Sequence, residues 1–96
     1  MKFSITLFIV FISSFCYSQK IIKGKVTDKT THEPLEGAVI SNIRSSANTL
    51  TDQNGNFTLK NVNNEDILTA TYIGYVSEKT SPVSFGKVVN IELEKG

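Results

Sequence analysis

The stretch Thr51-Asp52-Gln53-Asn54-Gly55-Asn56-Phe57 decides how the middle of this chain folds. Asp and Asn side chains hydrogen-bond to nearby backbone groups, and Gly adopts a positive φ without steric cost. This order of residues is therefore typical of a tight turn. We predict a hairpin at residues 52–55 that joins a short strand at residues 49–51 to a strand with Phe57 and Leu59 on one face.

Outward from this turn, short alternating segments are separated by polar turns, and no window shows a convincing helical period. Five further strands are predicted from the alternation, at residues 22–28, 38–43, 67–73, 75–79 and 87–94. Gly74 interrupts the chain between two of them as a bulge or bend. Seven short strands with frequent turns predict an all-β fold, a small antiparallel β-sandwich.

The N-terminus has the pattern of a secretory signal peptide. Lys2 is followed by an apolar run at residues 3–15 and then by Cys16-Tyr17-Ser18-Gln19, which matches the charged, apolar and small-residue regions of such signals. We predict a signal peptide at residues 1–18 and one domain at residues 19–96. A membrane anchor is the alternative, but the run makes only about 20 Å of helix against about 30 Å of hydrocarbon. An acylated Cys16 is disfavoured because Phe15 stands where lipoproteins need a small residue.

Loss of residues 1–18 would remove Lys2 and Cys16 and leave nine basic and nine acidic residues. A balanced charge gives no indication of a nucleic-acid partner or of binding to an anionic membrane. The remaining domain has no cysteine, so it can form neither a disulfide nor a thiolate. It must be stabilised by packing alone, although a domain of this size buries only about 60% of its unfolded surface.

The residues that could carry chemistry do not assemble into a catalytic or metal-binding motif. Asp52, Asn54 and Asn56 alternate as in a calcium loop, but Gly55 is at the fourth position and the twelfth is Asn63 instead of Glu. His32 is the only histidine, and it has no nucleophile or ligand set at motif spacing. We therefore predict no catalytic, cofactor-binding or metal residues and no cofactor, with His32 exposed in a loop.

Four ordered motifs resemble a known family. They are Ile22-x-Gly24-x-Val26-x-Asp28, Glu33-Pro34-Leu35-x-Gly37-Ala38, Thr51-Asp52-x-x-Gly55-x-Phe57 and Tyr72-Ile73-Gly74-Tyr75. Together they are similar to the carboxypeptidase regulatory-like domain, and the resemblance covers residues 20–95. It implies a transthyretin-like β-sandwich, found beside metallocarboxypeptidases and at the N-terminus of SusC-type TonB-dependent outer-membrane receptors of Bacteroidetes.

The resemblance implies a non-enzymatic module, exported to the periplasm or associated with the outer membrane, that serves TonB-dependent nutrient uptake. Because the sequence ends directly after the last predicted strand, we expect a stand-alone module or the N-terminal piece of a receptor. A TonB-dependent receptor or another envelope protein is the expected partner. The alternative is a soluble periplasmic or cell-surface adaptor that binds a glycan or peptide outside transport. Substrate and oligomeric state are not indicated.

Individual residues carry further expectations. Phe57 and Tyr72 lie on apolar faces and are predicted core residues, and one of Tyr72 and Tyr75 should keep its phenol oxygen hydrated at the rim. Asn42 stands where the family usually has an apolar residue, so either the strand register shifts there or the sheet edge is wet. Unpaired strand edges accept other strands, so residues 87–94 are predicted to face a partner while residues 52–55 stay in solvent.

Overall fold

The computed structural model describes residues 20–96. The predicted signal peptide at residues 1–18, its cleavage after Ser18 and the assignment of Cys16 all lie outside the described residues. Within residues 20–96, no helix combines the length and apolar character needed to cross a bilayer.

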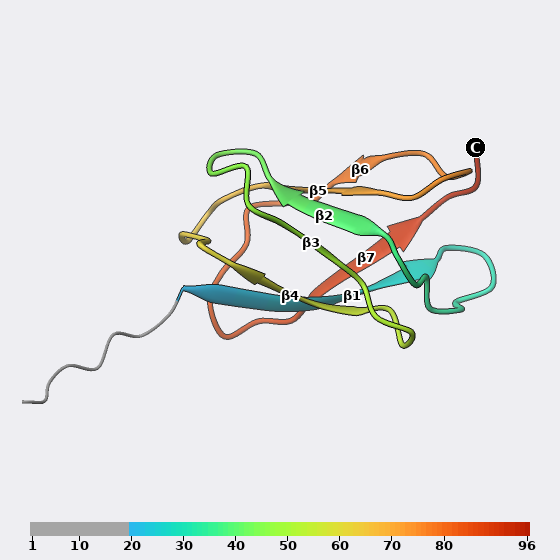
Figure 1. Cartoon of the computed structure of the whole chain (residues 1–96), viewed down its shortest axis with the longest axis horizontal. Helices are drawn as coiled ribbons and strands as arrows, with labels where there is room; N and C mark the ends of the chain where they lie inside the picture. Colours follow the sequence, from blue (N-terminus) through green and yellow to red (C-terminus); the bar gives the residue numbers. More distant parts are fainter. Residues whose placement is uncertain (1–19) are drawn as a thin grey trace, which may run out of the picture.

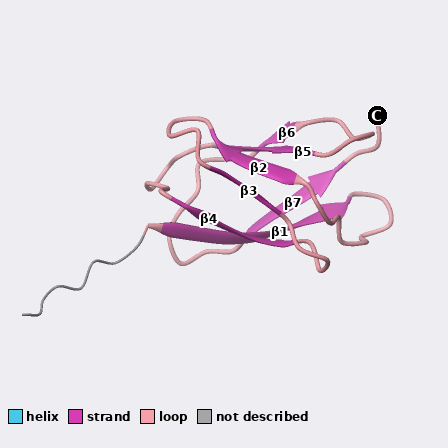
Figure 2. Cartoon of the chain, viewed as in Figure 1, coloured by secondary structure: helices cyan, strands magenta, loops and turns pink. Residues whose placement is uncertain are grey.

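Two β-sheets face each other and form the molecule (Figures 1 and 2). One sheet has the strand order β4-β1-β7 and the other has the order β3-β2-β5-β6. The strands are β1 (Ile21–Asp28), β2 (Val39–Asn42), β3 (Asn48–Leu50), β4 (Asn56–Lys60), β5 (Leu68–Thr71), β6 (Glu78–Lys79) and β7 (Val89–Leu93). The predicted small β-sandwich of seven strands is confirmed.

Strand pairing departs from the sequence prediction in two respects. β1 and β7 run parallel, whereas every other pair is antiparallel. The prediction of a hairpin at residues 52–55 is wrong, because β3 and β4 belong to different sheets and do not pair with each other. The turn itself is present, with the Gly55 amide bonded to the Asp52 carbonyl at 2.8 Å. Its flanking strands pair with β2 and β1 instead of each other, so the turn carries the chain from one sheet to the other.

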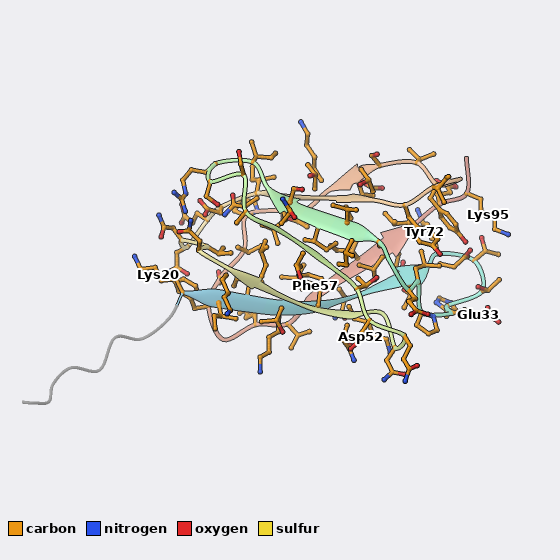
Figure 3. All side chains as sticks on the ribbon, viewed as in Figure 1. Lys20, Glu33, Asp52, Phe57, Tyr72 and Lys95 are labelled. Atoms are coloured by element: carbon orange, nitrogen blue, oxygen red, sulfur yellow. The ribbon has the colours of Figure 1, made fainter. Side chains whose placement is uncertain are left out.

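The core lies between the sheets and follows the predicted alternation. Ile22 and Val26 of β1, and Phe57 and Leu59 of β4, are buried from one sheet. From the other sheet and the connecting segments, the core receives Leu35, Ala38, Ile40, Val62, Leu68, Ala70 and Val83, and β7 adds Ile91 and Leu93. Phe57 is confirmed as a core residue, and its ring lies between the sheets in Figure 3. Tyr72 is only half-buried and packs against the edge of this core.

Gly24 sits in the middle strand of its sheet and leaves room for an aromatic ring. It is opposite Phe57 on β4 and opposite Val89 on β7. A Cβ atom at this position would overlap the Phe57 ring and the Val89 carbonyl oxygen. Only glycine therefore permits this packing, because it has no Cβ.

Thr51 joins the loop before β2 to the end of β3. Its buried hydroxyl donates to the Leu35 carbonyl at 2.5 Å and accepts the Ala38 amide at 2.8 Å. The adjacent turn is held down at Gly55, whose carbonyl accepts the Val26 amide at 2.8 Å. Gly55 has φ 78°, and a Cβ there would press on Pro34 and on the Val26 carbonyl. Contrary to the expectation that the whole turn is exposed, its glycine is buried against β1.

Candidate interaction site

β7 forms one open edge of the sandwich. It pairs with β1 on one side and ends the β4-β1-β7 order on the other. The Leu93 carbonyl accepts the Lys29 amide at 2.8 Å, so Leu93 directs its backbone groups toward β1. Because successive residues of a strand direct these groups to opposite sides, the amides and carbonyls of Asn90 and Glu92 point away from β1. The edge that the sequence predicted is therefore present, and among residues 20–96 no backbone partner meets these donors and acceptors of Asn90 and Glu92.

A groove of about 460 Å³ runs beside this edge. β7 and the two residues before it make one wall, and β6 with the segment that follows it makes the other. The lining residues are Glu78, Lys79, Thr80, Ser81, Pro82, Val83, Ser84, Lys87, Val88, Val89, Asn90, Ile91 and Glu92. β6 is itself the last strand of the second sheet. The groove therefore opens where the edges of both sheets lie on the same side of the sandwich.

The groove has a different charge at each end of β7. Lys87 precedes the strand, and Glu92 lies near its end. Glu78 and Lys79 are sequence neighbours of opposite sign on the facing wall, so they contribute little net charge. Glu92 also lies 3.8 Å from Nδ1 of His32, which is exposed as predicted. A bound molecule would meet a cation at the start of β7 and a carboxylate near its end.

The C-terminal segment covers the edge beyond Glu92. The Glu94 carbonyl accepts the Val76 amide at 2.8 Å, and Tyr75 pairs with Lys95 in an isolated antiparallel bridge. Tyr72 and Lys95 lie at the end of the sandwich opposite Lys20 (Figure 3). The free part of the edge is therefore bounded on this side.

Asp28 and Tyr75 form a polar contact at the same end. The Asp28 carboxylate accepts the Tyr75 hydroxyl at 2.5 Å and the backbone amides of Thr30 and Thr31 at 2.7 and 2.9 Å. The hydrogen bond from Tyr75 is the main cause that lowers the pKa of Asp28 to about 2. The same bond raises the pKa of Tyr75 to about 12. Asp28 therefore holds the turn that follows β1, and the Tyr75 phenol oxygen is bonded to a carboxylate.

The rings of Tyr72 and Tyr75 pack beside this contact, with centroids 5.5 Å apart and planes tilted by 54°. Between the two tyrosines the chain turns at Gly74, which has φ 85°. The predicted break at Gly74 is therefore a turn that brings the rings together.

Asn42, Arg44 and Asp66 form a second polar cluster that the sequence analysis did not predict. Asn42 is 1% exposed, and its Nδ2 donates to Oδ2 of Asp66 at 2.8 Å. Arg44 Nε is 3.0 Å from Oδ1 of the same carboxylate. The Asn42 side chain is the leading cause that holds the pKa of Asp66 below its ordinary value. Neither expectation for Asn42 is correct, because the register continues opposite Leu68 and the residue is buried with a carboxylate.

The candidate metal residues at the sheet-crossing turn serve the turn itself. Oδ1 of Asp52 accepts the backbone amides of Asn54 and Asn56, both at 2.9 Å. Across residues 20–96, no group of three or more His, Cys, Asp or Glu is arranged to hold a metal ion. Asp52 therefore acts as a local cap, as its place in a turn signal predicts.

Comparison with solved structures places this arrangement among known folds. Two crystal structures of type II cohesin–X-dockerin complexes from Acetivibrio cellulolyticus, an N-terminal and a C-terminal interface mutant, contain similar chains. The TM-scores are 0.63 and 0.58, at 21% and 19% identity, and the similarity covers 79% and 75% of this chain. It covers 58% and 51% of the matched chains, so this protein spans little more than half their length. At this identity the similarity shows a shared fold. None of the curated proteins compared with the chain matches it.

A family model for the CarboxypepD_reg-like domain matches residues 22–95, from the first strand to the bridge after the last. The chain belongs to the CarboxypepD_reg-like domain family. The resemblance drawn from the four motifs is thereby confirmed.

In this CarboxypepD_reg-like domain, the four motifs form structural contacts with one another. The first and third motifs meet where the Val26 amide donates to the Gly55 carbonyl. The second and third motifs meet where the Thr51 hydroxyl donates to the Leu35 carbonyl. The first and fourth meet where Tyr75 donates to Asp28. Their spacing along the chain therefore reflects the packing of the sandwich, while Asn90 and Glu92 lie outside every motif.

Proposed function

We propose that this CarboxypepD_reg-like domain is a non-enzymatic module, exported to the periplasm or associated with the outer membrane, that binds an envelope protein in TonB-dependent nutrient uptake. The observation that carries the proposal is the open edge of β7 beside a groove of about 460 Å³. Unpaired strand edges and adjacent grooves are surfaces through which β-sandwiches bind other proteins.

The use of the buried carboxylates supports a role without catalysis. Asp28 and Asp66 both accept several hydrogen bonds from neighbouring loops, and the pKa of each is lowered by those bonds. A general acid or base that works near neutral pH needs a pKa close to that pH. These two carboxylates are shifted in the opposite direction, as expected for groups that fasten loops.

Two observations support a protein partner in the envelope. The family resembled by the four motifs includes N-terminal domains of SusC-type TonB-dependent receptors. The structures that share the fold are described as complexes between cohesin and X-dockerin, which are assemblies of proteins. The apolar run at residues 3–15, with its signal-peptide pattern, supports export.

Site-specific photocrosslinking in an outer-membrane preparation tests this proposal. A photoreactive residue at Lys87 samples the groove, and one at Gln53 samples the exposed turn away from it. We expect products with a receptor or another envelope protein from Lys87 and none from Gln53. Products from Gln53 alone would place the partner on the other surface. Products from neither site would contradict an envelope partner.

A soluble adaptor that binds a peptide or glycan outside transport is the second candidate. The groove favours it in one respect, since Thr80, Ser81, Ser84 and Asn90 supply hydrogen-bonding side chains beside Val83 and Ile91. Fractionation separates the two functions, because an adaptor would stay free in the soluble fraction with no crosslink to a membrane protein.

A further inference from the structure

We infer that the groove binds its partner by strand addition, in which a short extended segment of another protein pairs with the outer edge of β7. The segment would become the fourth strand of the β4-β1-β7 sheet. The inference rests on the proposed partner-binding function and specifies the chemistry of the partner.

The backbone of β7 carries the first step. Leu93 and the other odd-numbered residues of β7 direct their backbone groups to β1, so Asn90 and Glu92 each present an amide and a carbonyl to the groove. Only another extended backbone offers matching donors and acceptors at the two-residue spacing of these groups. The site therefore selects an extended polypeptide.

The length of the free edge sets the length of the segment. The edge is available from Val88 to Glu92, because Glu94 is already bonded to Val76 on that side. Five residues of strand extend about 17 Å at roughly 3.3 Å per residue. We therefore expect a binding segment of about five to seven residues.

The walls of the groove set the pattern of side chains. A strand placed beside β7 directs alternate side chains between the sheets, where Val83 and Ile91 are buried and Val89 is half-buried. Lys87 at one end of β7 favours an acidic residue, and Glu92 near the other end favours a basic one. The partner is thus a segment that alternates apolar and polar residues between an acidic and a basic end.

The edge of a second copy fits this groove less well. In a folded copy, Ile91 is 5% exposed and Leu93 is fully buried. These side chains already fill the core of their own sandwich, so they cannot also enter the groove of a neighbour. A segment that is unstructured before binding has its alternate side chains free.

Synthetic heptapeptides provide the test with the full chain. The probe has three valines that alternate with two threonines, between a terminal glutamate and a terminal lysine, and a control of the same composition groups the valines together. Two more versions of the probe carry N-methyl groups on alternate backbone amides. One version is methylated at the odd-numbered residues of the peptide and the other at the even-numbered residues. Because only one set of peptide amides faces β7 in an added strand, one methylated version should lose binding and the other should keep it.

Amide hydrogen exchange locates the bound peptide. We expect at least tenfold slower exchange for the amides of Asn90 and Glu92 when the probe is bound. The amide of Ile91, which faces β1, should change little. Slower exchange confined to the Ile73–Gly74 turn, where Ile73 is 91% exposed, would overturn the assignment.

A matched pair of variants at Asn90 tests the hydrogen bond that the Asn90 backbone amide would donate to the added strand. Asn90→Pro removes an amide that does not serve the β1 ladder, and proline is tolerated at such positions of an edge strand. Asn90→Ala removes the side chain but keeps the amide. Loss of one backbone bond should weaken binding of the probe by about five- to tenfold in Asn90→Pro relative to Asn90→Ala. If Asn90→Pro lowers the melting temperature much more than Asn90→Ala, Glu92→Pro and Glu92→Ala replace the pair.

The outcomes separate this inference from the proposed function. Strand addition would be overturned if the two methylated probes bind equally, or if the control with grouped valines binds as tightly as the probe. An envelope crosslink at Lys87 would still support partner binding in that case. Failure of every probe to bind would likewise overturn it. A dimer by light scattering, with Asn90 and Glu92 protected in the absence of peptide, would assign the edge to a second copy. Absence of envelope crosslinks from both Lys87 and Gln53 would instead contradict the proposed function.

Discussion

The hydroxyl of Tyr75 donates a hydrogen bond of 2.5 Å to Oδ2 of Asp28, 47 residues earlier in the chain. This contact fastens the turn after β5 to the end of β1, next to the bridge between Tyr75 and Lys95. It therefore holds the segment that bounds the free edge of β7.

The Tyr75–Asp28 bond predicts a characteristic dependence of stability on pH. The pKa of Asp28 is lowered from 3.8 to about 2, so its contribution is present above about pH 4 and is lost as the pH falls toward 2. The pKa of Tyr75 is raised from 10.0 to about 12, so its contribution is present below pH 10 and is lost as the pH rises toward 12. We expect the melting temperature to fall as the pH drops below about 4 and again as it rises above 10.

Tyr75→Phe should lower the melting temperature at pH 7 and flatten the fall above pH 10. The fall below pH 4 should become shallower but persist, because Thr30 and Thr31 still donate to Asp28. Tyr72→Phe is the control, since Tyr72 does not bond to Asp28. An alkaline profile of Tyr75→Phe that matches that of the wild type would show that the bond does not form in solution.

Phe57 is expected to be the most costly aromatic residue to truncate. It is 4% exposed and packs over Gly24, so Phe57→Ala should cost about 3 to 5 kcal/mol of the free energy of unfolding. That loss is large against the total stability of about 5 to 15 kcal/mol that is typical of native proteins. Denaturant unfolding measures it, with the exposed neighbour in Thr58→Ala as control. A wild-type midpoint for Phe57→Ala would contradict the packing.

Asn42 is expected to stabilise the protein through the carboxylate of Asp66. Asn42→Leu keeps a similar volume but removes the donor to Asp66, so the melting temperature should fall by several degrees. The pKa of Asp66 should rise toward its ordinary value, which moves acid unfolding to higher pH. Asn48→Leu, at an exposed position of β3, provides the matched control. An unchanged acid transition in Asn42→Leu would mean that Arg44 and the backbone amide of Asn63 suffice to stabilise the carboxylate.

Millimolar calcium is expected to leave the melting temperature unchanged, because Oδ1 of Asp52 is bonded to two amides of its own turn. A ligand that binds only the folded state adds about 2.7 kcal/mol at a hundredfold excess over its Kd, which thermal unfolding would detect. A calcium-dependent rise that disappears in Asp52→Ala would establish a metal site at the turn.

The exported protein is expected to begin at Gln19. The apolar run at residues 3–15 is short for a membrane span and suits a cleaved signal. Mass spectrometry of the N-terminus in the periplasmic and membrane fractions measures this directly. Recovery of residues 1–18 in a membrane-bound chain would show that the segment is retained as an anchor.

Local pattern determined the strands and the family. Alternation in residues 22–28 and 89–93 predicts strands because successive side chains point to opposite faces, and this holds whatever the partner strand is. Turn chemistry at Asp52 and Gly55 is equally local, since a carboxylate bonds to the next amides and glycine adopts a positive φ. The four motifs could be matched to a family because their order lies in the sequence itself.

Only the tertiary structure decided which strands pair and where the polar residues meet. The same turn signal can join two paired strands or two sheets, and the choice depends on contacts that lie far apart in the sequence, such as Thr51 with Leu35. Asn42 and Asp66 are 24 residues apart, so neither shows from its own neighbours that the other satisfies it. Which backbone groups of residues 87–94 stay open, those of Asn90 and Glu92, is likewise invisible to periodicity, because alternation assigns side chains to faces but does not indicate where another segment lies alongside.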